Sequence, residues 1–424
     1  MRKIICTTIV FSLLSSFYAN GQNNSIITLD QCIEAAVRYN PVIKEAESEL
    51  NIASSEVRIA QSGLYPVIAT ELSGGYSDEY RLNNNYRTGT GTISAEQVLW
   101  QKGRIKESIE RARYSLQADV NSLAARKLDI IIAVKNVYLN CLMQSQLFKA
   151  ASENVSNASL FLEYAREKFR IGAGRKSDVL KAESDLSEAQ YEKDVFLNSL
   201  STSQNDLGML TGLPPAGFSE LENFYSSNKK YDFEEDFDTL LAKASRNYPE
   251  LMQVNNMQLA QQAAIREVKA ERYPELSLNA GYNWSYNPAL PGQRGWLTAM
   301  TMRWQLFNGS KNLARIEGEK SRESVYVNRK NELKDFLKKE ISNRLINLRE
   351  AISQIKLTEK LLLTTSENLE IARAQYKAGT GSMLELTTAR NDALDASKKN
   401  IKAITDFRLA LINLERLTEN KNQY

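Results

Sequence analysis

The feature that most constrains this 424-residue chain is an internal duplication. The segment RYNP that ends at Pro41 returns 208 residues later as RNYP, which ends at Pro249. The segment GAG that starts at Gly172 returns 207 residues later as GTG, which starts at Gly379. Because the same segments recur in the same order at nearly the same spacing, we expect the chain to fold into two similar units.

The duplication divides the chain into two repeats and two further segments. The first repeat is expected over 22–213 and the second over 239–424, with a linker over 214–238 that holds two adjacent prolines and an acidic run. Residues 1–21 are expected to be a secretory signal peptide, because a charged start, an apolar stretch and small residues follow one another there. Cys6 lies too early for a lipoprotein cleavage site, so a lipid anchor is not expected.

Composition argues against several classes of function. The chain has no histidine, which is the commonest general base and metal ligand, and it has no phosphate-binding loop and no CxxC pair. We therefore expect no enzyme activity and no cofactor. Lys and Arg together (54) nearly balance Asp and Glu (51), which argues against nucleic-acid binding. Cys32 and Cys141 remain in the mature chain, and the sequence does not decide whether they form a disulfide.

Long uninterrupted segments predict long helices. The 68 residues 104–171 contain no glycine and no proline, and as a helix they would extend roughly 100 Å at about 1.5 Å per residue. Apolar residues recur at threes and fours through this segment and through 319–378, which follows Gly318. Each segment ends at a Gly-x-Gly turn before another helical segment, which predicts helical hairpins over about 104–211 and 311–418.

Alternating residues predict a β-hairpin in each repeat. Short helices are expected over 41–63 and 249–272, followed by hairpins over about 66–101 and 275–307. The first hairpin is expected to have a polar loop over 78–87. Strands of nine to eleven alternating residues are typical of outer-membrane barrels, although a soluble hairpin on a core alternates in the same way. Since the long helices use their apolar stripes on each other, the membrane interpretation is favoured, and four strands that cannot close a barrel would then require oligomerisation.

In this arrangement the chain resembles the TolC-type outer-membrane efflux proteins. The resemblance rests on ITLDQCIEAA over 27–36, the following Asn40-Pro41, the Tyr-Pro pair before each hairpin, and the two Gly-x-Gly turns. It implies a mixed α and β membrane protein, a homotrimer whose four strands per chain form a twelve-stranded barrel in outer-membrane lipid and whose long helices form a periplasmic tunnel. It also implies a passive duct that works with a periplasmic membrane-fusion adaptor and an inner-membrane pump of the RND or ABC type.

The resemblance further implies roles for residues near the Gly-x-Gly turns. The family's gate has acids just after the second turn, where Glu385 occupies the first position and Thr388 the second. A ring of three Glu385 side chains would favour cations. An acid in the first turn of a helix also stabilises the helix start; we favour this role for Asp178 and the pore role for Glu385. The expected adaptor-facing residues are Gly172, Gly174, Arg175, Asp178, Gly379 and Gly381.

The strands supply a second set of candidate residues. Arg303 and Gln305 are expected to line the barrel lumen, with a position at the rim as the alternative for Arg303. Aromatic residues in or near the strands are expected to form the girdles of the membrane interface: Trp100, Tyr282, Trp284, Trp296 and Trp304. The alternative function is a periplasmic coiled-coil adaptor or tether without a pore, which the long helices would fit equally well but which leaves membrane-length strands unexplained.

Overall fold

The structure is a computed structural model that describes residues 27–79, 84–215, 231, 233–286 and 292–418. The expected signal peptide and most of the expected linker lie outside these residues. The described chain divides into two compact units. We call them the turn unit, with residues up to 39, from 133 to 231 and from 354 to 406, and the strand unit, with the remainder.

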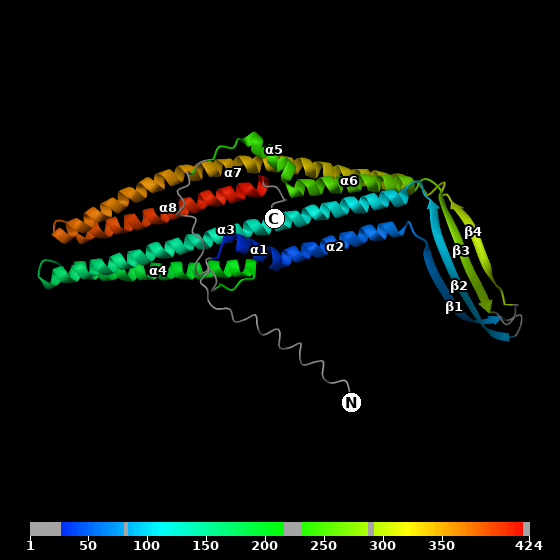
Figure 1. The fold of residues 1–424 in the computed structure, drawn as a ribbon, viewed down its shortest axis with the longest axis horizontal. Helices are drawn as coiled ribbons and strands as arrows, with labels where there is room; N and C mark the ends of the chain where they lie inside the picture. Colours follow the sequence, from blue (N-terminus) through cyan, green and yellow to red (C-terminus); the bar gives the residue numbers. More distant parts are fainter. Residues whose placement is uncertain (1–26, 80–83, 216–230, 232, 287–291, 419–424) are drawn as a thin grey trace, which may run out of the picture. The chain divides into compact units, whose positions relative to one another are not determined.

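The turn unit is built mainly from helices that reverse direction at the two Gly-x-Gly turns (Figure 1). It contains α1 (Leu29–Tyr39), α4 (Lys176–Thr211) and parts of α3 (Arg104–Arg170), α7 (Lys311–Ala378) and α8 (Met383–Thr418). All four long helices contribute to one core, so the two helical hairpins pack on each other. The buried residues of this core are mostly aliphatic, with several alanines: Phe161, Leu162, Ala165, Ala182, Ala372, Tyr376, Met383, Leu386 and Ala389.

The strand unit adds three shorter helices to the remaining parts of α3, α7 and α8: α2 (Pro41–Ser62), α5 (Phe237–Asn247) and α6 (Pro249–Ala270). Proline in the first turn starts both α2 and α6. The Asn40 side chain also caps α2 by accepting a hydrogen bond from the Val42 amide at 3.0 Å. Charged pairs join α6 to α3, including Arg111–Glu267 at 3.1 Å.

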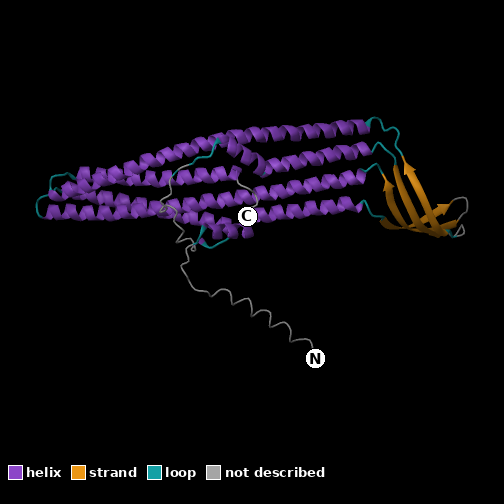
Figure 2. Ribbon diagram, turned by 45° about the horizontal axis from the view of Figure 1, so that its top comes forward, coloured by secondary structure: helices purple, strands orange, loops and turns teal. Residues whose placement is uncertain are grey.

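Four antiparallel strands form one sheet in the order β1-β2-β3-β4 (Figure 2). They are β1 (Val67–Glu79), β2 (Asn84–Trp100), β3 (Glu275–Tyr286) and β4 (Arg294–Arg303). Strand pairing places most of the large apolar side chains of the four strands on one face, whereas Val67, Val98 and Leu297 lie on the other. At Gly91 the mainly apolar face has no side chain, and a Cβ there would lie 2.0 Å from the Trp284 ring, so glycine makes room for the tryptophan. Two β-hairpins and two long helical hairpins are therefore confirmed.

Several expected boundaries are wrong. The polar loop over 78–87 is too long, because β1 and β2 continue to pair as far as Glu79 and Asn84; backbone ladder bonds do not require apolar side chains. The start of α7 at Lys311, in contrast, is as expected, and Gly318 lies inside this helix, where a single glycine costs about 1 kcal/mol, a small loss for a 68-residue helix. The second hairpin, expected to reach about 307, ends at Arg303, and α5 begins at Phe237, inside the expected linker.

Among the described residues, no helix combines the length and the apolar character that crossing a membrane would require.

Candidate functional site

The two Gly-x-Gly turns have the same backbone geometry. Gly172 and Gly379 have φ angles of +76° and +82°, a left-handed conformation that side chains disfavour. In both turns the next residue donates a backbone hydrogen bond to the carbonyl five positions earlier: Ala173 to Lys168 at 2.9 Å and Thr380 to Gln375 at 3.0 Å. The duplicated sequence therefore produces the same turn twice.

The second glycine of each turn is needed for close packing. A Cβ at Gly174 would lie 3.0 Å from the backbone nitrogen of Phe169, and a Cβ at Gly381 would lie 3.3 Å from that of Tyr376. Both contacts are tighter than ordinary van der Waals distances. The shape of the turn thus accounts for all four glycines, whether or not an adaptor contacts them.

Glu385 takes part in a capping box at the start of α8. Its carboxylate accepts a hydrogen bond from the Ser382 amide at 2.8 Å, and the Ser382 hydroxyl accepts one from the Glu385 amide at 3.2 Å. The bond from the Ser382 amide lowers the pKa of this exposed carboxyl. Glu385 therefore stays ionised and is held in one orientation.

The start of α4 differs from the start of α8. Arg175 occupies the position before the helix and makes no side-chain capping bond, although the equivalent residue before α8 is Ser382. Asp178 lies in the first turn of α4, where its charge can stabilise the helix start, as expected, whereas the side-chain capping bond is made by Glu385 at the start of α8. Asp178 lies near Tyr376 of α7, whose pKa is raised first by burial and then by the Asp178 charge.

Burial along α8 separates a packed face from an exposed face. Met383, Leu386, Thr387, Ala389 and Arg390 are each at most 5 % exposed, whereas Glu385 and Thr388 are exposed on the other side. Residues three apart share a helix face, so the two expected gate positions point in the same direction. The structure therefore brings Glu385 and Thr388 together.

Reciprocal lysine–tyrosine contacts join α3 and α7 next to the turns. The Lys168 ammonium lies 4.1 Å from the centre of the Tyr376 ring and also donates to the Tyr376 carbonyl. The Lys377 ammonium lies 4.7 Å from the centre of the Tyr164 ring, and its hydrogen bond lowers the pKa of Tyr164. Each helix thus supplies one lysine and one tyrosine.

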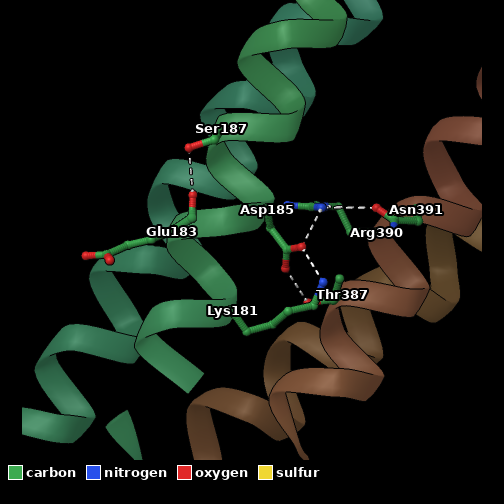
Figure 3. Close-up of polar contacts among 7 residues, drawn as sticks. All are labelled: Lys181, Glu183, Asp185, Ser187, Thr387, Arg390 and Asn391. Atoms are coloured by element: carbon green, nitrogen blue, oxygen red, sulfur yellow. Dashed lines mark hydrogen bonds and ion pairs between the residues drawn. The ribbon is translucent and has the colours of Figure 1, made fainter. Parts of the chain in front are cut away.

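A buried polar cluster joins α4 to α8 a little further from the turns (Figure 3). Asp185 of α4 is 1 % exposed and accepts hydrogen bonds from Lys181 at 2.7 Å and from the Thr387 hydroxyl at 3.0 Å. Arg390 of α8 is 4 % exposed, and its guanidinium lies 4.0 Å from the Asp185 carboxylate. Arg390 also donates to Asn391 at 3.0 Å.

Sequence reasoning missed this cluster. Its signal is present, since Asp185 lies three residues after Ala182 and four before Ala189 on the apolar face of α4. A carboxylate in such a face requires a partner, because an unpaired buried charge is strongly unfavourable. The sequence does not reveal that the partners lie about 200 residues away on α8.

In the strand unit, the aromatic residues form two groups on the sheet. Tyr282 lies 5.1 Å from Trp296 and 6.4 Å from Trp284 between ring centres. Trp100 pairs with Leu276, six residues before Tyr282 on β3, so at about 3.4 Å per residue the two groups lie roughly 20 Å apart. An outer-membrane barrel has an apolar band about 25 Å tall between its aromatic girdles; with strands tilted by about 40°, roughly 20 Å along the strand corresponds to about 15 Å of height, which is less than that band.

The predicted lumen residues and Trp304 lie at the end of β4. Arg303 is the last residue of the strand, opposite Glu275 in the register, whereas Gln305 lies beyond it. The alternation that assigned Gln305 to the polar face therefore does not reach it. Trp304 also lies beyond β4, and its indole nitrogen donates to the Arg272 carbonyl at 3.2 Å.

Comparison with known proteins extends over nearly the whole chain. The sequence model of the outer membrane efflux protein family matches residues 32–213 and 240–419. Outer membrane protein TolC of Vibrio cholerae is 20% identical over 402 residues, which cover 91% of this chain and 89% of TolC. Nodulation protein T of Rhizobium leguminosarum bv. trifolii is 22% identical over 389 residues, covering 89% of this chain and 82% of that protein.

Solved structures show the same fold. A CusC crystal structure superimposes with a TM-score of 0.81 at 18% identity and covers 96% of each chain. The outer-membrane channel OprN gives a TM-score of 0.79 at 16% identity, covering 92% of this chain and 89% of its own. Both combine duplicated halves, four antiparallel strands and long helices.

These findings confirm the expected fold, the outer-membrane location with a periplasmic helical extension, and the absence of enzyme activity in this family. Members of the family assemble as trimers and work with efflux partners. The chain belongs to the outer membrane efflux protein family and is an efflux channel of a tripartite system.

Proposed function

We propose that three copies of Glu385 form the narrowest charged ring of the channel. The supporting observation is its geometry: the carboxylate is exposed, it lies in the first turn after the second Gly-x-Gly turn, and Ser382 holds it. A ring of fixed carboxylates attracts cations and hinders anions. Thr388 lies on the same face and adds a hydroxyl but no charge, so Glu385 supplies the field at this end of α8.

The ring would stay charged over most of the physiological range. The pKa of Glu385 is lowered by its hydrogen bonds to Ser382, so the carboxylate stays ionised until the pH falls below its ordinary value. Three like charges in one ring would raise this pKa again, because each disfavours ionisation of the others. Cation preference should therefore weaken in acid.

The turns themselves are proposed to face a periplasmic membrane-fusion adaptor, which connects the channel to an inner-membrane pump of the RND or ABC type. Arg175 and Lys176 make the first turn basic, whereas Thr380 and Ser382 leave the second turn uncharged. An adaptor that contacts both turns would meet positive charge at one and a neutral surface at the other. The proposed adaptor-facing residues remain Gly172, Gly174, Arg175, Asp178, Gly379 and Gly381.

The strands are proposed to cross the outer membrane with the apolar face toward lipid. The aromatic residues at the two ends of this face would form the interface girdles, and Arg303 would lie at the lumen or its rim. The repeats over 22–213 and 239–424 would then each supply one β-hairpin and one long helical hairpin.

Two variants separate the charge of Glu385 from its role as a helix cap. Glu385→Gln removes the charge but keeps an oxygen that can accept from the Ser382 amide, whereas Ser382→Ala removes the hydroxyl and keeps the charge. Single-channel recording in planar bilayers should show a lower cation-to-anion permeability ratio for Glu385→Gln and a nearly unchanged ratio for Ser382→Ala. An unchanged ratio in Glu385→Gln would limit Glu385 to capping.

A further inference from the structure

The direction in which Glu385 points depends on how α8 is rotated about its axis. With 3.6 residues per turn, Thr387 and Arg390 lie about 200° and 140° around the helix from Glu385. Both face the Asp185 carboxylate of α4. The polar cluster therefore holds the side of α8 opposite to Glu385.

Apolar packing and the polar cluster both restrain this rotation. Met383 and Leu386 of α8 are buried in the core before Thr387, but the residues directly around Asp185 are small. Ala182 and Ala189 flank Asp185 on α4, and Ala389 lies next to Arg390 on α8, all of them at most 2 % exposed. Apolar contact is non-directional, and small side chains interlock less than large ones. Hydrogen bonds depend on angle as well as distance, so the bond from Thr387 to Asp185 specifies the setting of the helix.

The charges of Asp185 and Arg390 also favour one rotation of α8, because both groups are buried. Burial lowers the pKa of Arg390, and the nearby carboxylates of Asp185, Glu188 and Glu192 raise it. Asp185 is the buried one of these three acids, whereas Glu188 and Glu192 line an open groove with Arg390. Lys181 lies beside Asp185 on the same helix, half exposed, and cannot connect the two helices. A rotation that separated Arg390 from Asp185 would leave a buried carboxylate with only a half-exposed partner.

We propose that Asp185 is a positioning residue of the channel: through Thr387 and Arg390 it fixes the rotation of α8 and thereby directs Glu385. The inference builds on the proposed role of Glu385, but it can be tested without it. Among the described residues of the second repeat there is no copy of this contact, because the equivalent of Asp185 is Asp392, which is exposed. Control of this kind therefore acts from the first repeat on the second.

Thiol labelling of the assembled trimer measures the rotation directly. A cysteine at the exposed position, Thr388→Cys, should react readily, whereas a cysteine at the adjacent buried position, Ala389→Cys, should react slowly. In the background Asp185→Asn, which keeps the side-chain shape but removes the charge, we expect labelling at 389 to accelerate and labelling at 388 to slow. The native Cys32 and Cys141 are buried, and their labelling is subtracted with the parent protein.

Three further variants keep the test decisive. Thr387→Val removes one hydrogen bond at constant shape and should change the labelling in the same direction but less, which covers the case that Asp185→Asn fails to assemble. Adding Arg390→Gln to Asp185→Asn removes the orphaned charge and should restore part of the wild-type pattern. Asp194→Asn, an exposed aspartate on the same helix, should leave labelling unchanged.

Channel recording separates the two proposals. If both hold, Asp185→Asn lowers the cation-to-anion permeability ratio toward that of Glu385→Gln. If labelling shifts while Glu385→Gln leaves the ratio unchanged, Asp185 positions α8 but Glu385 is not the gate. Unchanged labelling at 388 and 389 in both Asp185→Asn and Thr387→Val would overturn the positioning role.

Discussion

The two Gly-x-Gly turns of this channel have the same backbone conformation but different side chains. Both use a left-handed first glycine and a second glycine that packs against the preceding helix. After the turn, α8 begins with the capping box of Ser382 and Glu385, whereas α4 begins with Arg175 and no side-chain cap. The duplication has thus preserved what the backbone requires, while charge and capping have diverged.

The same contrast between the repeats appears further along α4 and α8, at two equivalent aspartates. Asp185 is buried and bonded to the opposite hairpin, whereas for Asp392 the described residues supply no hydrogen-bond or ion-pair partner. Equivalent positions in a duplicated chain therefore carry different tasks. The differences between the halves indicate where the two copies act unequally.

The largest expected effect tests the two aspartates against each other. Asp185→Ala should lower the free energy of unfolding by about 3 kcal/mol, because it leaves Arg390 buried without its closest counter-charge. Asp392→Ala should change stability by less than about 0.5 kcal/mol, as is usual for exposed sites. Urea titration of helical circular dichroism in detergent measures both. Equal losses would remove the distinction drawn between the halves.

The next effect tests whether the turns are equivalent. Gly172→Ala and Gly379→Ala should each cost about 1–2 kcal/mol, since both residues adopt left-handed backbone. Neither site has an atom close to the added Cβ, so conformational strain is the whole effect. The same titration checks it, and a much larger loss at one glycine would show that the turns differ in more than side chains.

A smaller effect tests the helix starts by exchanging their residues. Ser382→Ala should lower stability by about 1 kcal/mol, because it removes half of the capping box. Arg175→Ser should raise stability by up to about 1 kcal/mol, because α4 has no side-chain cap at present. Thermal unfolding of each variant, compared with the wild type, measures both effects. If Arg175→Ser leaves stability unchanged, the backbone amides at the start of α4 already have other hydrogen-bond partners.

The smallest effect is the pH dependence of the α8 start. The folded-state pKa of Glu385 is lowered, so its contribution to stability is full above the ordinary carboxyl pKa and is lost as the pH falls through the lowered value. The stability difference between wild type and Glu385→Gln should therefore shrink on acidification across this window. A constant difference from neutral to acid pH would contradict a charged capping carboxylate.

Much of this fold was predictable because it depends on local sequence. The Gly-x-Gly turns, the prolines that start α2 and α6, and the alternating strands each follow from the conformational preferences of nearby residues. The capping box was also readable in principle, as a serine followed three residues later by a glutamate. It was underestimated at Glu385 because the resemblance favoured the pore role there.

The rest depends on contacts between distant residues. Asp185 and Thr387 are 202 positions apart, and no local pattern states that they meet. No local pattern predicts the contact between Lys168 and Tyr376 either. Strand ends were misplaced for a related reason: polar residues after Tyr76 suggested a loop, but pairing with β2 carries β1 on to Glu79. The strand ends and the contacts between helices depend on which elements pack together, and a single sequence does not show that pairing.

The junction between β2 and β3 has a consequence for how the copies of the chain join. It pairs the last strand of one repeat with the first strand of the next, with Ala95 opposite Ala280. The 208-residue offset between the repeats makes Leu72 equivalent to Ala280. The two hairpin registers then make Met302 equivalent to Ala95. If the same junction is repeated between neighbouring copies of a trimer, Met302 would lie opposite Leu72 of the neighbouring copy. The β2–β3 pairing within one chain is thus a guide to the β4–β1 pairing expected between two chains.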